Sequence, residues 1–122
     1  MLMSGNGTLL RIFVGERDKH GHIPLYEWII QQARHQGLAG ATVFRGIEGF
    51  GAHSQVHTSK ILRLADDLPI VIEIVDTKEK IERFLPIIDG AIPEGLATLE
   101  KVEVRLYRKG PSPQEPPEDP AA

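Results

Sequence analysis

The residues best suited to chemistry lie in one short segment, residues 45–51, which contains three glycines within six positions. Glycines let the backbone turn sharply and point its N–H groups at an anion. Arg45 offers a guanidinium for a phosphate, and Phe50 offers a ring that could lie against a base. The order G-x-x-G-x-G matches neither the dinucleotide-binding fingerprint nor the P-loop. The segment therefore indicates either a phosphate site or a bulged strand end that needs glycine for its geometry.

A long segment without sustained periodicity follows, from Glu48 to about Asp67. Loops of about twenty residues are uncommon in compact domains and are usually functional or disordered. Its donors to an anion or a partner include Ser54 and Thr58, together with His53, His57, Lys60 and Arg63. We expect the last four to form a partner-docking loop.

These residues do not form a pattern that predicts catalysis. His53 and His57 are four apart, but the segment lacks a helical pattern and the glutamate of H-E-x-x-H, so we predict no metal site. No nucleophile, base and orienting group are in register. Glu73 is the single charge in an apolar segment, and we expect an ion pair across a subunit interface, with a catalytic acid as the alternative. We therefore predict a protein that is not an enzyme and needs no cofactor; a hydrolase using His53 or His57 with Glu73 is the alternative.

Composition supports a single globular domain. The chain has 122 residues, of which 41% are hydrophobic and 25% charged, enough for one core without disulfides. The absence of cysteine excludes a thiolate nucleophile and thiolate metal sites. A net charge of −3 argues against a nucleic-acid partner. No stretch has the pattern of a membrane span or a signal peptide, so we expect a cytoplasmic protein.

Hydrophobic periodicity predicts the elements that position these residues. We expect strands at 9–14, 41–47 and 68–75 and a last strand after the turn at 93–95. One helix is expected to start with Pro24 and to end at Gly37. The second helix follows Asp76, which with Glu79 suggests a capping box, and Pro86 is expected to kink or shorten it.

The order strand, helix, strand, strand, helix, strand predicts an α+β, ferredoxin-like fold, with one antiparallel sheet and two helices on one face. Segment 68–75 is nearly continuously apolar, so we expect a central strand buried on both faces. Leu9 and Phe13 would place apolar groups on the bare face, which predicts contact with another subunit. We expect a flexible N-terminus (1–8), a domain (9–108) and a disordered, Pro-rich tail (109–122).

The chain also resembles a known family. The resemblance is carried by GERDKHGHIPLYEWI, by GLAGATVFRGIEGFGAHSQVHTSKILRLADDLPIVIEIVD, and by KIERFLPIIDG. These segments resemble the PII-like family of previously unknown function, whose members are often encoded beside fluoride-export channels and are related to PII nitrogen-regulatory signalling proteins. The resemblance covers about residues 9–107, and the central block is specific to that family.

The resemblance implies a homotrimer that binds a nucleotide in clefts between subunits. By position, the base of the loop corresponds to Arg45, Gly46, Gly49, Phe50 and Gly51, and the turn before the last strand to Glu94, Gly95 and Leu96. Arg105, on the polar face of the last strand, is expected to join this pocket if that strand lies near its own or a neighbour's glycine segment. The turn lacks the lysine of the PII phosphate-binding turn, so among AMP, ADP and ATP the smaller two fit better.

The favoured hypothesis is a signalling trimer in which an adenine nucleotide or similar anion orders the loop. The ordered loop would then dock a target such as a membrane channel or transporter. The alternative is a ligand-free trimeric interaction module for such a membrane protein.

Overall fold

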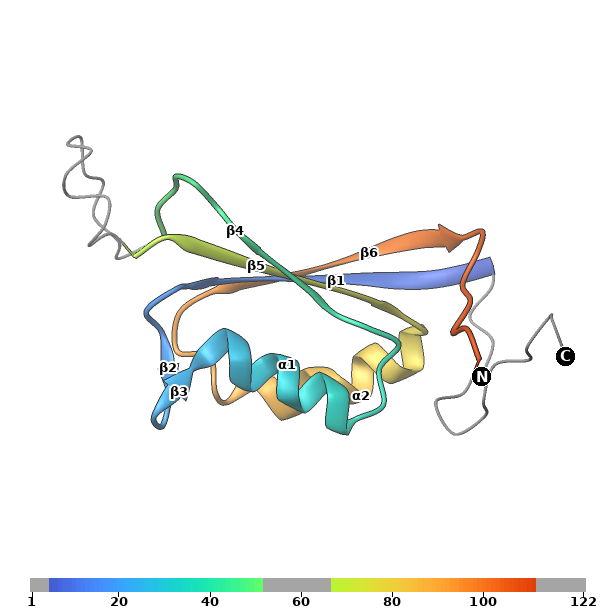
Figure 1. The fold of residues 1–122 in the computed structure, drawn as a ribbon, viewed down its shortest axis with the longest axis horizontal. Coiled ribbons are helices and arrows are strands. Elements are labelled where there is room, and N and C mark those ends of the chain that lie inside the picture. The colour runs from blue at the N-terminus through green and yellow to red at the C-terminus, as the bar shows by residue number, and fades with distance from the viewer. Residues whose placement is uncertain (1–4, 52–66, 112–122) are drawn as a thin grey trace, which may run out of the picture.

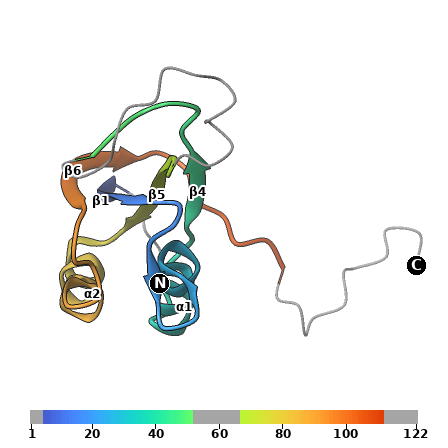
Figure 2. The same cartoon turned by 90° about the vertical axis from the view of Figure 1, so that its left-hand side faces the viewer.

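A computed structural model describes residues 5–51 and 67–111. Its elements, in chain order, are β1 (Gly5–Gly15), β2 (Lys19–His20), β3 (Ile23–Pro24), α1 (Leu25–His35), β4 (Thr42–Arg45), β5 (Pro69–Asp76), α2 (Lys78–Asp89) and β6 (Leu96–Val104). Strands β4, β5, β1 and β6 form an antiparallel sheet in that order, and β2 pairs with β3 in a small separate hairpin. Both helices lie on one face of the sheet (Figures 1 and 2). The ferredoxin-like α+β prediction is confirmed.

The core lies between the sheet and the two helices. Alternate residues of β1 and β5 point toward the helices and are buried, because side chains of a strand alternate between its faces. The helices contribute residues at helical spacing to the same layer. The buried apolar side chains of the described residues are Leu10, Ile12, Val14, Leu25, Ile29, Ala33, Ile70, Ile72, Ile74, Ile81, Phe84 and Ile88.

Strand β5 is central, as predicted, with β4 on one side and β1 on the other. The prediction that it is buried on both faces was wrong for the single chain. Its burial alternates, with Ile70, Ile72 and Ile74 buried and the residues between them half-buried. Figure 2 shows the reason: the helices cover one face of the sheet only.

The start of α2 differs from the prediction. Its N-cap is Thr77, whose hydroxyl oxygen accepts a hydrogen bond from the Lys80 N–H at 3.3 Å. Asp76 is instead the last residue of β5, where it pairs with Thr8 and is only 2% exposed. Its carboxylate accepts hydrogen bonds from the N–H groups of Ala39 (2.8 Å) and Thr77 (2.6 Å). Asp76 therefore joins the segment before β4 to the start of α2.

Several helix and strand boundaries also differ from those predicted from the sequence. Strand β1 begins at Gly5, so residues 5–8, predicted to be flexible, belong to it, and Thr8 is buried. Pro24 precedes α1 as its N-cap instead of forming its first residue. The prediction for Gly37 is confirmed, since it follows α1 with a φ of 71°. Helix α2 continues past Pro86 to Asp89, so the proline does not shorten it there.

Within residues 5–51 and 67–111, neither helix has the length and apolar character needed to cross a membrane. The predictions for His53, His57, Lys60 and Arg63, and for most of the Pro-rich tail, fall on residues outside those that the structure describes.

Candidate functional site

The glycine segment begins where β4 ends. Arg45 is the last residue of β4 and pairs with Ile70 of β5. The next N–H, that of Gly46, donates to the carbonyl oxygen of Pro69 at 2.7 Å. A Cβ on Gly46 would lie 2.6 Å from Pro69 Cγ, and one on Gly49 would lie 3.0 Å from the same atom. These two glycines therefore allow the segment to pack closely on Pro69, which favours a geometric role for them. The Gly46 N–H donates to Pro69 and is therefore not directed at a ligand.

The rest of the segment is open to solvent. The side chain of Phe50 is 71% exposed and that of Ile47 is 86% exposed. Gly51 is exposed and is the last described residue before the gap. A planar ligand could therefore reach the Phe50 ring from the solvent side.

Arg45 already has an anionic partner in its own chain. Its guanidinium forms an ion pair with the carboxylate of Glu16, which follows β1 directly. The Arg45 side chain remains 60% exposed, whereas Glu16 is 26% exposed. A guanidinium has five N–H donors in a fixed fork, so it can keep one carboxylate and still bind a second anion. Glu16 thus holds Arg45 at the end of the sheet, and sequence spacing gave no signal for this pair.

The turn before β6 packs tightly on β1. A Cβ on Gly95 would lie 2.6 Å from the carbonyl oxygen of Phe13, closer than side chains tolerate. The following residue, Leu96, pairs with Phe13 and leaves its side chain 58% exposed. Glu94 is also exposed. The turn therefore has a fixed backbone position and carries a carboxylate but no basic side chain.

The two predicted halves of the site lie at the same end of the sheet but on opposite edges. Arg45 pairs with Ile70, Ile70 pairs with Val14, and the neighbouring Phe13 pairs with Leu96. Two strands therefore separate β4 from β6. Adjacent strands are about 4.8 Å apart, so the two edges are about 14 Å apart. One chain therefore does not close a pocket from both halves.

Arg105 lies at the other end of the sheet. It follows Val104, the last residue of β6, which pairs with Gly5 at the start of β1. Eight residues of β1 separate Gly5 from Phe13, or about 26 Å of strand. The Arg105 side chain is 85% exposed, with Nε 3.6 Å from Oε1 of Glu103. Within one chain, Arg105 does not join the glycine segment, and its contribution across a subunit interface stays a prediction.

Glu73 has a partner that the sequence did not indicate. Its Oε2 accepts a hydrogen bond from Arg11 Nε at 2.7 Å, and the two residues are directly paired across β1 and β5. The expected ion pair between subunits is therefore corrected to a pair within one chain. In the described part of the chain, no cluster of three or more His, Asp or Glu side chains could hold a metal ion.

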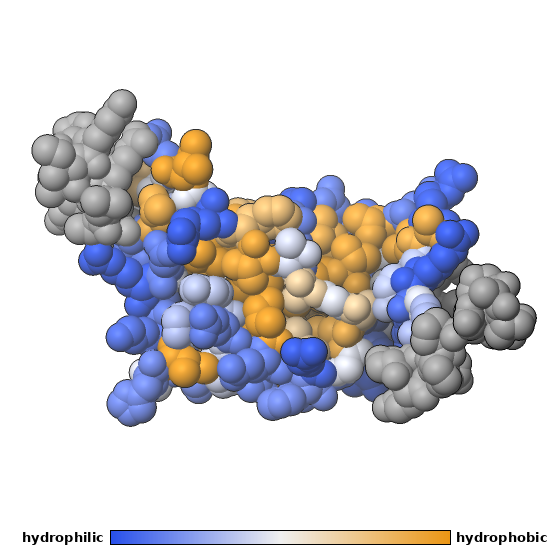
Figure 3. Space-filling view, in the orientation of Figure 1, coloured by the Kyte–Doolittle hydropathy of each residue, from blue (hydrophilic) through white to orange (hydrophobic). Residues whose placement is uncertain are grey.

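The outer face of the sheet carries an apolar row that crosses all four strands. Strand register places Phe44, Val71, Phe13 and Leu96 side by side on the face away from the helices. Phe44 is 49% exposed and Leu96 is 58% exposed, while Val71 and Phe13 are half-buried. Figure 3 views the sheet edge-on, from the side of β4 and α1, and shows apolar surface across the middle of the molecule. Phe13 could be predicted from the sequence, but the row could not, because strand register is needed to align its members.

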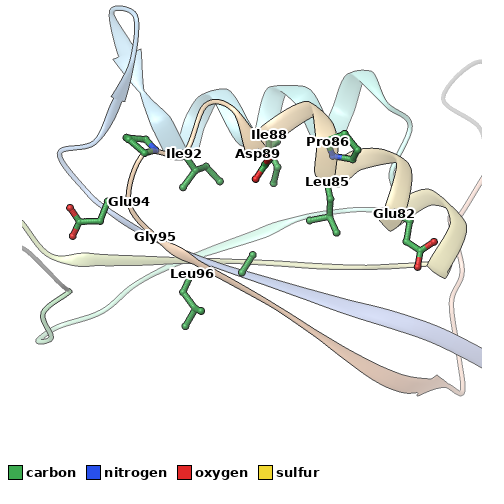
Figure 4. A pocket seen from close by; sticks show the side chains of 11 residues that line it. Glu82, Leu85, Pro86, Ile88, Asp89, Ile92, Glu94, Gly95 and Leu96 are labelled. Carbon is green, nitrogen blue, oxygen red and sulfur yellow. The ribbon is translucent and has the colours of Figure 1, made fainter.

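A groove separates α2 from β6, with a volume of about 720 Å³. Leu85, Ile88 and Ile92 line its helix side and Ala97 its strand side, while Leu96 points to the other face of the sheet (Figure 4). The groove also has three carboxylates, those of Glu82, Asp89 and Glu94, and no basic side chain among residues 5–51 and 67–111 lines it. The remaining lining residues are Pro86, Pro93 and Gly95. The groove thus starts at the predicted Glu94–Leu96 turn and extends along α2.

Solved structures of the protein CPII from Thiomonas intermedia K12 have the same fold. One, bound to ADP and bicarbonate, matches with a TM-score of 0.61 and 18% identity over 81% of this chain and 88% of that chain. Another, a nitrogen regulatory PII-like protein bound to ADP, AMP and bicarbonate, matches at 0.59 and 16% identity over 81% of this chain and 94% of that chain. The fold of the present chain is therefore PII-like.

The family follows from the sequence match. Residues 7–104 match the model of the DUF190 family, described as "Uncharacterized ACR, COG1993", and the chain belongs to this family. A UPF0166 protein of Aquifex aeolicus is 46% identical over 96 residues, which cover 79% of this chain and 90% of that protein. The predicted resemblance to a PII-like family of unknown function is confirmed.

Proposed function

We propose that this protein is a signalling trimer that binds an adenine nucleotide, or a similar anion, between its subunits and catalyses no reaction of its own. The observation that carries the proposal is the placement of the two candidate halves. Arg45 and the glycine segment lie on one edge of the sheet, and the Gly95 turn lies on the other edge at the same end. A neighbouring chain supplies the missing half of each site.

The apolar row on the outer face supports assembly. Four side chains in register form it, and neither helix covers that face (Figure 2). Burying apolar surface contributes about 25 cal/mol per Å². Trimer formation would remove the row from water and bring sheet edges of different chains together.

The structural relatives support the choice of ligand. CPII, which shares the fold, is bound to ADP in the two structures described above. In the present chain, Arg45 offers a guanidinium for a phosphate and the exposed Phe50 a ring for the base. The acidic Glu94 beside the Gly95 turn favours ligands with fewer phosphates, so AMP and ADP fit better than ATP.

In this proposal the loop between β4 and β5 docks the target, a membrane channel or transporter, through His53, His57, Lys60 and Arg63. Ligand contacts at residues 45–51 would favour one state of the loop that follows. A ligand-dependent change in protease cleavage between β4 and β5 is the expected sign.

One alternative has specific support. Gly46 and Gly49 are accounted for by packing on Pro69, and Arg45 is already paired with Glu16. Both facts suit a ligand-free trimeric interaction module equally well. A hydrolase using Glu73 is less well supported, because its carboxylate is engaged by Arg11.

Isothermal titration calorimetry with ADP, AMP and ATP tests the proposal. We expect ADP and AMP to bind and Arg45→Ala to weaken them about ten-fold or more, since hydrogen bonds to charged groups contribute about 1.5–3 kcal/mol. Arg34→Ala, at an exposed arginine in the last turn of α1, is the matched control and should bind normally. Absence of binding by all three nucleotides would favour the ligand-free module.

A further inference from the structure

The turn that follows β1 contacts the chain on both sides of the connection between β4 and β5. The carboxylate of Glu16 pairs with Arg45, the last residue of β4. The Glu16 N–H donates to the carbonyl oxygen of Leu68 at 2.8 Å. The next N–H, that of Arg17, donates to Oδ1 of Asp67, also at 2.8 Å. Figure 1 shows the end of β1, the end of β4 and the start of β5 on the same side of the molecule.

The backbone of this turn is fixed by contacts of its own. Oδ2 of Asp18 accepts a hydrogen bond from the Gly15 N–H at 2.9 Å, and the Asp18 N–H donates back to the Gly15 carbonyl oxygen at 3.2 Å. The Asp18 carbonyl oxygen also accepts a hydrogen bond from the N–H of Leu25, the first residue of α1, at 2.7 Å. Gly15 has no room for a side chain, because a Cβ there would overlap the Asp67 carboxylate. The side chain of Glu16 can therefore change position without breaking the hydrogen bonds that hold the turn.

Glu16 and a ligand phosphate at Arg45 would share one cation. The guanidinium has enough N–H donors for both groups, but the two anions repel each other. Glu16 thus has two opposing effects on affinity, since it orients Arg45 and also places a negative charge beside the phosphate. Arg45 is 60% exposed, and an exposed ion pair orients its partner only weakly. Repulsion from a doubly charged phosphate about 5 Å away exceeds that benefit even when water screens it.

We propose that Glu16 is a built-in competitor of the ligand, which lowers the affinity of Arg45 for phosphate and moves off the guanidinium when a phosphate binds. The competition rests on the proposed function, because it takes the ligand to be an adenine nucleotide with a phosphate at Arg45. In the ligand-free protein the carboxylate occupies the guanidinium. When the phosphate displaces it, the turn keeps its hydrogen bonds to Leu68 and Asp67 but loses its ion pair with β4. Ligand binding at the end of β4 therefore changes the contacts of the segment that leads into β5.

Calorimetry with ADP and AMP on the full-length protein and its Glu16→Gln variant tests the competition. Glutamine keeps the size of the side chain, and the hydrogen bonds to Leu68 and Asp67 come from the backbone, so the fold should be retained. We expect the variant to bind both nucleotides about three-fold more tightly or better, and the gain to shrink with added salt. Glu16→Asp keeps the charge and should stay within about two-fold of the wild type. Weaker binding by the Glu16→Gln variant would overturn the proposal and leave Glu16 as a group that only orients Arg45.

Glu79→Gln is the matched control for the loss of one carboxylate. Glu79 is exposed in the first turn of α2, just beyond Asp76. Six residues of β5 separate Asp76 from Ile70, the partner of Arg45, or about 20 Å of strand. The control should bind ADP with an affinity within about two-fold of the wild type, because water and salt screen a surface charge at that distance. A gain equal to that of the Glu16→Gln variant would reduce the effect to net charge and overturn the proposal.

Nuclear magnetic resonance tests the displacement itself. In ¹⁵N-labelled wild-type protein, ADP should shift the amide signals of residues 16 and 17, and in the Glu16→Gln variant these shifts should be at most half as large. Equal shifts in both proteins would mean that the carboxylate stays on Arg45, and would overturn the displacement. The wild-type titration reports separately on the proposed function. If the wild type binds ADP and the Glu16→Gln variant binds it more weakly, only the competition is disproved; if neither protein binds ADP or AMP, both proposals fail.

Discussion

Replacing Asp76 should cost more stability than its place at the end of a strand suggests. The side chain is 2% exposed and accepts hydrogen bonds from the N–H groups of Ala39 and Thr77. Hydrogen bonds to charged groups contribute about 1.5–3 kcal/mol each, and unsatisfied buried donors add to the loss. Water can hydrogen-bond to the two freed N–H groups and so recover part of these contributions. We therefore expect Asp76→Ala to lower the free energy of unfolding by about 3 kcal/mol. Since Ala39 precedes β4, the variant should also loosen the strand that carries Arg45.

Urea unfolding followed by circular dichroism measures this effect, with all variants at equal protomer concentration because assembly contributes to stability. With a slope of about 1.5 kcal/mol per molar, the midpoint should fall by about 2 M. Asp76→Asn keeps the side-chain volume but replaces one acceptor oxygen by a donor, so a similar loss there excludes a cavity effect. Glu27→Ala, at an exposed carboxylate on α1, is the control. If both Asp76 variants lower the free energy of unfolding by less than about 1 kcal/mol, Asp76 does not stabilise the contact between the segment before β4 and the start of α2.

The other predictions concern the sheet and its neighbours. Gly95→Ala places a Cβ 2.6 Å from the Phe13 carbonyl oxygen and should destabilise by about 1–3 kcal/mol, with amide shifts at the start of β6 in NMR spectra. A double-mutant cycle on Arg11 and Glu73, which are 37% and 31% exposed, should give about 0.5–1 kcal/mol of coupling that falls with added salt. Thr77→Ala should cost about 1 kcal/mol by removing the α2 N-cap, measured by urea unfolding, and no loss would contradict that role.

Much of the fold was predictable because it depends on local patterns. The alternation in Leu10, Ile12 and Val14 requires a strand with one buried face, and the burial agrees. The spacing of Ile81, Phe84 and Ile88 requires a helix with one buried stripe. Element order then restricts the topology to a small number of arrangements, of which split βαβ is one.

Asp76 shows where local patterns fail. An aspartate just before a helix is a typical N-cap, and Glu79 completes the usual signature. The register of β5 against β1 overrides this, because pairing with Thr8 extends the strand through Asp76 and turns its side chain inward. The capping role then passes to Thr77, the next residue able to accept the hydrogen bond.

The candidate site was predictable only as separate segments. Nothing in the sequence relates Arg45 to Glu16 or Glu73 to Arg11, because these contacts depend on which strands are neighbours and in what register. The same holds for the row that aligns Phe44 with Leu96 across the sheet. The α2–β6 groove has no motif at all, since it arises from the gap left where a helix and an edge strand meet.

The most direct test of the account is whether ADP binding requires more than one chain. Val71 lies in the middle of the apolar row but in neither half of the candidate site, so Val71→Glu should block assembly and leave Arg45 and Gly95 in place. Sedimentation and calorimetry on the same samples should find a wild-type trimer that binds ADP and a folded, single-chain variant that does not. A single-chain variant that binds ADP with wild-type affinity would contradict the claim that the site lies between subunits.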